Sequence, residues 1–163
     1  MYQGLEIADK MDETEKIGYK RRLVEECTTN LRTAASNTKV AMDEAQSSAN
    51  EYGRPKDRYD SYRMQVLKKR DMFAKQLIQT NEQIDVLGKI GVNKLHDKVE
   101  FGSVVLTDKQ NMFIATGIGR LKFEDGDIFV ISPNVPVYEA IKGKRKGDVV
   151  DFRGGKFKIE DVF

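Results

Sequence analysis

Two long helical patterns are separated by a decapeptide rich in turn formers and charge, which reads Glu51-Tyr52-Gly53-Arg54-Pro55-Lys56-Asp57-Arg58-Tyr59-Asp60. Gly53 brings conformational freedom, and Pro55 fixes its own φ and removes a backbone donor, so a helix cannot run through this stretch unchanged. The apolar repeats on its two sides are of similar length. The stretch therefore predicts an antiparallel helical hairpin with a charged tip near residues 51–60.

The apolar repeats have the a/d spacing of a coiled coil. In the first helix the expected seam positions are Ile17, Val24, Leu31, Thr38, Ala45 and Tyr52, with Cys27, Ala34, Ala41 and Ser48. In the returning helix they are Tyr59, Val66, Phe73, Thr80 and Leu87, supplemented by Tyr62, Leu77 and Ile84. We expect the bulkier residues of the second helix to fill the space opposite the small residues of the first, and Gly88 and Gly91 to end the hairpin.

The remaining sequence changes to strand signals. Strands are predicted at 101–106, 112–116, 118–123, 128–131, 149–152 and 157–162, with a short amphipathic helix at 137–142. The predicted fold class is α+β: a helical hairpin over residues 1–91, a linker over 92–98, and a small antiparallel sheet with one short helix over 99–163. We expect residues 1–13 to form a frayed helical extension.

Composition narrows the class of protein. The chain of 163 residues is 33% charged and 39% apolar, which is typical of a soluble protein, and its net charge of +2 does not by itself indicate a nucleic-acid or membrane partner. The lone Cys27 excludes an internal disulfide, and with His96 as the single histidine a Cys/His zinc site is not expected. There is no apolar run of about 18 residues and no signal-peptide core, so we expect a cytoplasmic protein.

Two motifs carry a family resemblance. Val99-x-Phe101-Gly102-Ser103-x-Val105 opens the second part, and Val137-x-x-Ala140-Ile141-x-Gly143-Lys144-x-x-Gly147-Asp148 follows a proline, with Gly154-Gly155 before the last strand. Over residues 14–163 the chain resembles the bacterial Gre transcript-cleavage factors and their relatives. The resemblance implies an FKBP-like C-terminal domain that docks on RNA polymerase, and a hairpin that enters the secondary channel of the polymerase.

The resemblance also implies roles for named residues. Where the family has an acidic pair at the tip, this chain has Arg54 and Asp57, so one acid is missing and hydrolysis is in doubt. Asp57 is the expected ligand of a Mg²⁺ shared with the polymerase active site, with Glu51 and Asp60 as substitutes. The docking loop aligns with Asn134-Val135-Pro136, of which only the proline is kept, and Ser132 and Pro133 are candidates for part of its role.

Several alternatives stay open from the sequence. The basic set near the tip, Arg54, Lys56, Arg58 and Arg63 with Lys68, Lys69, Arg70 and Lys75, is either a solvated face or a contact with the 3′ end of nascent RNA. We expect a monomeric accessory factor with no catalytic residue and no cofactor of its own. The alternatives are a non-cleaving channel blocker and, from other classes, a dimeric coiled-coil adaptor or a prolyl isomerase.

Overall fold

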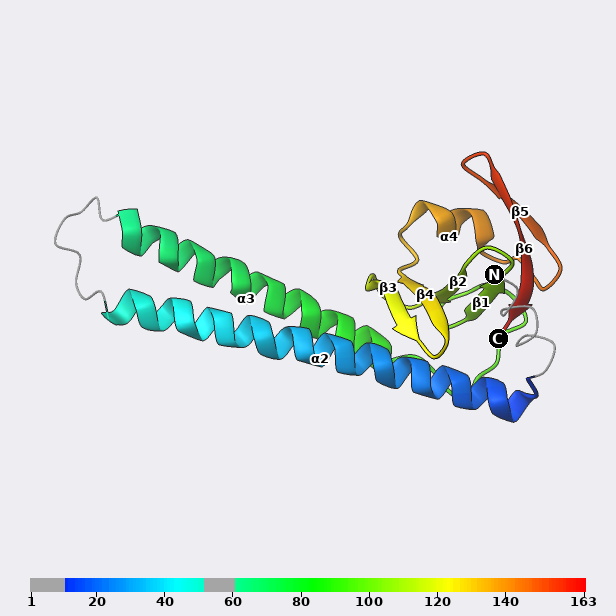
Figure 1. Cartoon of the computed structure of the whole chain (residues 1–163), viewed down its shortest axis with the longest axis horizontal. Helices are drawn as coiled ribbons and strands as arrows, with labels where there is room; N and C mark the ends of the chain where they lie inside the picture. Colours follow the sequence, from blue (N-terminus) through cyan, green and yellow to red (C-terminus); the bar gives the residue numbers. More distant parts are fainter. Residues whose placement is uncertain (1–10, 52–60) are drawn as a thin grey trace. The chain divides into compact units, whose positions relative to one another are not determined.

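The structure is a computed structural model that describes residues 11–51 and 61–163 (Figure 1). The chain divides into two compact units, one formed by Met1–Cys27 with Val86–Phe163 and the other by Thr28–Asp85. The first helix contributes to both units. The base of the hairpin therefore belongs with the sheet, while the domain boundaries at 91 and 99 stay a prediction from sequence.

The first described helix, α2, runs from Glu13 to Glu51 and begins at a capping box. The backbone N–H of Glu15 donates to Asp12 Oδ1 at 2.8 Å, and the N–H of Asp12 donates back to Glu15 Oε2 at 3.2 Å. These bonds satisfy backbone donors that the first helical turn leaves without a partner. The helix thus has a defined start at Glu13. A frayed helical extension was predicted for residues 1–13, of which residues 1–10 lie outside the described part of the chain.

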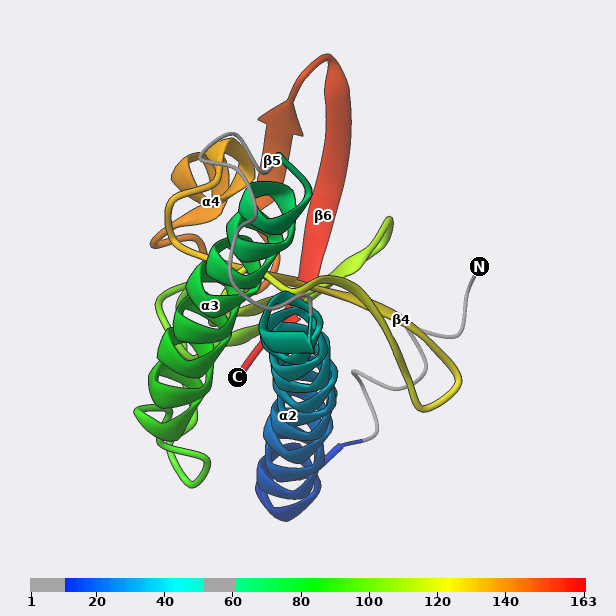
Figure 2. The same ribbon diagram turned by 90° about the vertical axis from the view of Figure 1, so that its left-hand side faces the viewer.

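The second unit is the helical hairpin, in which α2 and α3 (Ser61–Gly88) lie side by side and run in opposite directions (Figures 1 and 2). A hydrogen bond of 2.7 Å from Arg70 Nη1 to Gln46 Oε1 joins the two helices. Gly88 ends α3, as the sequence predicts. No helix within residues 11–51 and 61–163 is long and apolar enough to cross a membrane.

The phase of the α2 seam differs from the strict heptad prediction. Ala34 and Ser48 were expected in the seam but are exposed, and Ala49 is fully buried instead. The covered positions of α2 advance by four residues three times in succession, from Leu23 through Cys27 and Leu31 to Ala35, before steps of three and four alternate. Those consecutive steps of four move only two seam positions one residue later, to Ala35 and Ala49, since an ordinary helix drifts by about 20° per heptad. The other predicted positions of α2 within the described residues are covered: Ile17, Val24, Cys27, Leu31, Thr38, Ala41 and Ala45.

The α3 seam matches its prediction except near the tip. The covered residues include Val66, Phe73, Leu77, Thr80, Ile84 and Leu87. Tyr62 is the exception, because its side chain is 52% exposed. Tyr52 and Tyr59 lie outside the described residues.

The first unit contains a six-stranded sheet with the order β3-β4-β2-β1-β6-β5. Its strands are β1 (Val104–Thr107), β2 (Asn111–Ile114), β3 (Gly119–Phe123), β4 (Gly126–Ile131), β5 (Val149–Phe152) and β6 (Gly155–Val162). Four neighbouring pairs are antiparallel, but β2 and β4 are parallel, which corrects the all-antiparallel prediction. The reason is that β3 lies at the sheet edge and not between β2 and β4. The chain reverses direction at β3, and β4 then pairs with β2 in the same direction.

Helices cover both faces of this sheet. On one face α4 (Pro136–Ile141) packs its Val137, Tyr138, Ala140 and Ile141 against a core that includes Val105, Met112, Ile114 and Ile159. On the other face the ring of Tyr19, from the base of α2, meets the rings of Phe123 and Phe163 edge-on at 5.0 and 5.7 Å. Because strand side chains alternate between faces, Val104 and Phe113 belong to this second face and are fully buried.

Candidate functional site

The turn between β4 and α4 holds the residues expected to dock on the polymerase. The hydroxyl of Ser132 accepts from the backbone N–H of Asn134 at 3.3 Å, and the Ser132 carbonyl accepts from the N–H of Val135 at 3.4 Å. Pro136 follows as a first-turn residue of α4, where its missing N–H has no helical partner to lose. Local hydrogen bonds and a proline thus give the turn a defined conformation.

The exposure of this turn suits a contact surface. Asn134 and Pro136 are exposed, whereas Ser132, Pro133 and Val135 are half-buried. The turn presents one amide side chain and one proline ring to solvent, next to a short helix that is anchored in the core. The assignment of these five residues to docking stays a prediction.

The residues of the long motif after Pro136 have structural roles in a helix end and the loop that follows it. Gly143 and Gly147 have φ of +75° and +92°, a region that other residues rarely adopt. Asp148 closes the loop between them by accepting the N–H of Arg145 on Oδ2 at 2.8 Å. Ile141 is fully buried in the core cluster. The motif therefore specifies a helix end and a tight loop, and it is a signature of fold rather than of chemistry.

The tip residues lie mostly outside the described part of the chain. Arg54, Lys56, Asp57, Arg58 and Asp60 all belong to residues 52–60. Glu51 is the last residue of α2 and is exposed. The candidate shared Mg²⁺ site therefore stays a prediction. Within residues 11–51 and 61–163 no cluster of three His, Cys, Asp or Glu side chains is arranged to hold a metal ion.

The basic residues of α3 divide into two groups. Lys68, Lys69 and Lys75 are exposed, as a contact with an anionic partner requires. Arg70 instead is half-buried and bonds to Gln46 across the hairpin and to Asp71 at 2.6 Å. Arg63 is half-buried as well. Arg70 therefore stabilises the hairpin. The residues of α3 that remain candidates for RNA contact are Arg63, Lys68, Lys69 and Lys75.

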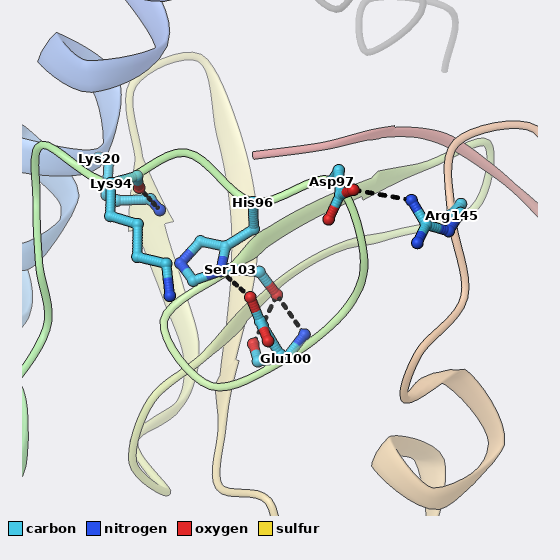
Figure 3. Close-up of polar contacts among 7 residues, drawn as sticks. All are labelled: Lys20, Lys94, His96, Asp97, Glu100, Ser103 and Arg145. Atoms are coloured by element: carbon cyan, nitrogen blue, oxygen red, sulfur yellow. Dashed lines mark hydrogen bonds and ion pairs between the residues drawn. The ribbon is translucent and has the colours of Figure 1, made fainter.

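A buried polar junction, shown in Figure 3, joins the base of α2 to the segment before the sheet. Lys20 is fully buried, and its Nζ donates to the backbone carbonyl of Lys94 at 2.8 Å. Burial, with a smaller contribution from the neighbouring charge of Lys94, lowers the pKa of Lys20 to about 8. The sequence does not mark Lys20 as buried, because a pattern of polar and apolar residues predicts that a lysine is exposed.

His96 has a partner that the sequence did not reveal. Its Nδ1 donates to Glu100 Oε1 at 2.6 Å, and the hydroxyl of Ser103 bonds to the backbone carbonyl of Glu100 at 2.6 Å (Figure 3). Burial lowers the pKa of His96, while the hydrogen bond to Glu100 opposes that change. The same bond lowers the pKa of Glu100. Gly102, with φ of +87°, lies against the His96 ring, where a Cβ would come within 3.5 Å of Nε2. The first motif is thus also a structural signature.

Two ion pairs complete the junction. Lys16 Nζ lies 3.0 Å from Oδ2 of Asp161, whose side chain is only 4% exposed. Arg145 Nη1 lies 2.8 Å from Asp97 Oδ2 at the surface. Cys27 is fully buried, as predicted, and burial raises the pKa of its thiol to about 12. Lys16 and Lys20 therefore hold the base of α2 against β6 and the segment before the sheet.

Comparison with known proteins finds similarity among solved structures. One is described as the transcription factor Gfh1, with 17% identity over 84% of this chain and 93% of that chain, at a TM-score of 0.35. Another is described as the GreA factor homolog 1 (Gfh1) protein of Thermus thermophilus, with 17% identity over 83% of this chain and 94% of that chain, at a TM-score of 0.31. No protein-family description matches the sequence, and no curated protein matches it either.

Proposed function

We propose that this protein is a Gre-like transcription elongation regulator, which binds RNA polymerase and places the tip of its helical hairpin in the secondary channel. The observation that carries the proposal is the agreement between motif and fold. Most residues through which the sequence resembles the Gre factors occupy positions that the sheet domain requires: Val99, Ser103, Val105 and Ile141 are buried, and Gly102, Gly143, Gly147 and Gly154 have positive φ, whereas Phe101 and Lys144 are exposed. A chance match to the motifs would not place them at such positions.

In this proposal the sheet domain provides the docking contact. Asn134 and Pro136 are exposed on the turn that leads into α4, and a rigid, exposed turn loses little conformational entropy on binding. The hairpin then supplies reach, because residues 28–51 of α2, which lie outside the unit of the sheet, extend for about 36 Å at 1.5 Å per residue. Any chemistry takes place in the polymerase active site, and the protein itself is an accessory factor without a catalytic residue of its own.

The tip decides between stimulation and inhibition. Asp57 is the one acid at a family position, and Arg54 occupies the companion position. A positive charge at about 4 Å from a cation costs on the order of 1–4 kcal/mol even with strong screening, so affinity for a second Mg²⁺ is expected to be poor. We therefore propose weak or no stimulation of transcript cleavage, which makes the non-cleaving channel blocker the second candidate.

A transcript-cleavage assay on backtracked complexes tests this reading, with polymerase from the same organism. Wild type is expected to cleave weakly, Arg54→Asp to cleave more, and Arg54→Asp with Asp57→Ala to lose the gain. Strong cleavage by wild type that is unchanged by Asp57→Ala would show that the tip assignment is wrong. A protein that forms dimers in sedimentation and has no affinity for polymerase would instead be the coiled-coil adaptor.

The docking turn has a separate test. Asn134→Ala is expected to weaken binding to core polymerase by roughly tenfold, since truncation of a central interface residue costs about 1–2 kcal/mol. Asp125→Ala, in the exposed turn between β3 and β4, is the matched control and should bind as wild type does. Equal affinities for all three proteins would place the docking contact elsewhere.

A further inference from the structure

The strongest unexplained feature outside the candidate site is a concentration of positive charge near the C-terminus. We call residues 142–158 the basic ribbon, which comprises the loop after α4, β5, and the first part of β6. It contains seven Lys or Arg residues against two Asp, a net charge of +5, whereas the whole chain carries only +2. The rest of the protein is therefore net negative, and the basic ribbon is a local feature that the total charge conceals.

Two of the seven cations are committed to ion pairs. Lys142 pairs with Glu139 at 3.1 Å, and Arg145 pairs with Asp97 at 2.8 Å. The other five are exposed and have no carboxylate oxygen within ion-pairing distance in the described part of the chain: Lys144, Lys146, Arg153, Lys156 and Lys158. These five cations are therefore available for an anionic partner.

The geometry of the ribbon places two of these cations on one of its faces. β5 is the edge strand, and it pairs with β6 so that Val149 faces Lys158 and Asp151 faces Lys156. Because strand side chains alternate, Lys156 and Lys158 lie on the same face of the ribbon. Figure 2 shows β5 and β6 reaching out from the rest of the sheet. The ribbon is thus a projecting two-stranded element with one face that carries Lys156 and Lys158 beside Val149 and Asp151. The remaining free cations, Lys144, Lys146 and Arg153, lie in the loop before β5 and in the turn between the strands.

The aromatic residues of the ribbon favour one class of polyanion. Single-stranded nucleic acids bind best where bases stack on open aromatic rings. Here Arg153 lies over the ring of Phe152 at 5.1 Å, and Phe157 packs against the core cluster. Neither ring offers an open stacking surface. Duplex DNA needs only cations for its phosphates, and its major groove is wide enough for a two-stranded ribbon.

We propose that the basic ribbon binds the phosphate backbone of duplex DNA without reading its sequence. This activity is separate from the proposed binding to polymerase, and it would hold the factor near a transcribed template. It requires no contact from the hairpin. An acidic protein surface is the competing partner for the same cations, and the experiment below distinguishes the two.

The test is fluorescence anisotropy of a labelled duplex of about 20 base pairs with mixed sequence, titrated with the full chain in the absence of polymerase. Each phosphate contact contributes a slope of about −0.9 to the dependence of log K on log salt. Lys156→Ala with Lys158→Ala is therefore expected to reduce the slope by about 2, and to weaken binding roughly tenfold at low salt. Lys89→Ala with Lys122→Ala removes two exposed lysines elsewhere in the same unit and should change neither value.

Several results would overturn the proposal. The wild type could fail to bind the duplex at about 50 mM salt. The control variant could lose as much duplex affinity as the ribbon variant, or the wild type could bind single strands of the same sequence more tightly than the duplex. Unchanged duplex binding with weaker polymerase binding in the ribbon variant would assign the cations to an acidic protein partner. Lys144→Ala with Lys146→Ala, in a loop outside the strands, repeats the test if the first variant unfolds. Since polymerase is absent, the DNA result is independent of the proposed function.

Discussion

Replacement of Lys20 by Met gives the sharpest test of how the hairpin base is held. The side chain of Lys20 is fully buried, with a single hydrogen bond to the Lys94 carbonyl among the described residues. Its pKa is lowered from 10.5 to about 8 in the folded state. Between these two values the unfolded chain binds a proton that the folded chain does not, so the free energy of unfolding rises with pH.

The magnitude follows from the two pKa values. Between pH 7 and pH 10 the contribution of Lys20 to the free energy of unfolding should rise by on the order of 2 kcal/mol. The stability of wild type minus that of Lys20→Met should show this rise, because the pH dependence of all other groups cancels in the difference. Burial also raises the pKa of Tyr19, but that residue is present in both proteins.

The measurement is chemical denaturation of both proteins at several pH values from 7 to 10, which is within reach of ordinary buffers. Lys89→Met, at an exposed position of the same unit, is the control and should show no pH-dependent difference from wild type. A flat difference between wild type and Lys20→Met would mean that the ammonium group is solvated at neutral pH. The reasoning that places Lys20 inside the junction would then be wrong.

Three further predictions concern stability. Leu31→Ala should cost about 2–3 kcal/mol of unfolding free energy because Leu31 is only 5% exposed, and thermal or urea unfolding checks this. Ala49→Glu should lower the melting temperature strongly, because it buries a charge, while Ser48→Glu at the neighbouring exposed position should have little effect. A larger loss for Ser48→Glu than for Ala49→Glu would mean that Ser48 is the seam residue, as the heptad repeat predicts. Asp161→Asn should cost about 1–3 kcal/mol by leaving Lys16 without its acid, and no loss in urea unfolding would mean that the ion pair is not formed.

Much of the fold follows from local patterns in the sequence. β5 has the predicted bounds, and α3 ends at the predicted glycine. These successes have a common cause, since alternation of side chains and glycine positions are local signals. The hairpin follows in the same way from Gly53 and Pro55 between two helical repeats.

The failures arise where local signals carry no information. The parallel pairing of β2 with β4 depends on which strands become neighbours, which a period of two does not encode. The α2 seam is rich in small residues, so Ala34 and Ala35 differ too little in hydrophobicity to fix the phase. His96 and Glu100 meet outside any helix, and Lys20 is buried by a segment more than 70 residues away in sequence.

The candidate site was predicted by resemblance rather than by local pattern. In the turn at residues 132–136, which is ordered by its own hydrogen bonds, Asn134 and Pro136 are exposed, and the docking role of the turn stays a prediction. The tip residues that carry the expected chemistry lie outside the described part of the chain. The physical reading of both motifs nevertheless shows why they accompany this fold, because each contains a glycine with positive φ.

The proposed function requires the tip of the hairpin to reach the polymerase active site. An iron chelate attached to a cysteine at position 57 would test it directly, because hydroxyl radicals cleave only polypeptide and RNA close to the iron. Cys27 is buried and its thiol pKa is about 12, so the introduced cysteine should be the only one labelled. The proposed function predicts cleavage of the polymerase around its catalytic centre and of the RNA 3′ end. Cleavage confined to the outer surface of the polymerase, or none at all with the complex formed, would contradict it.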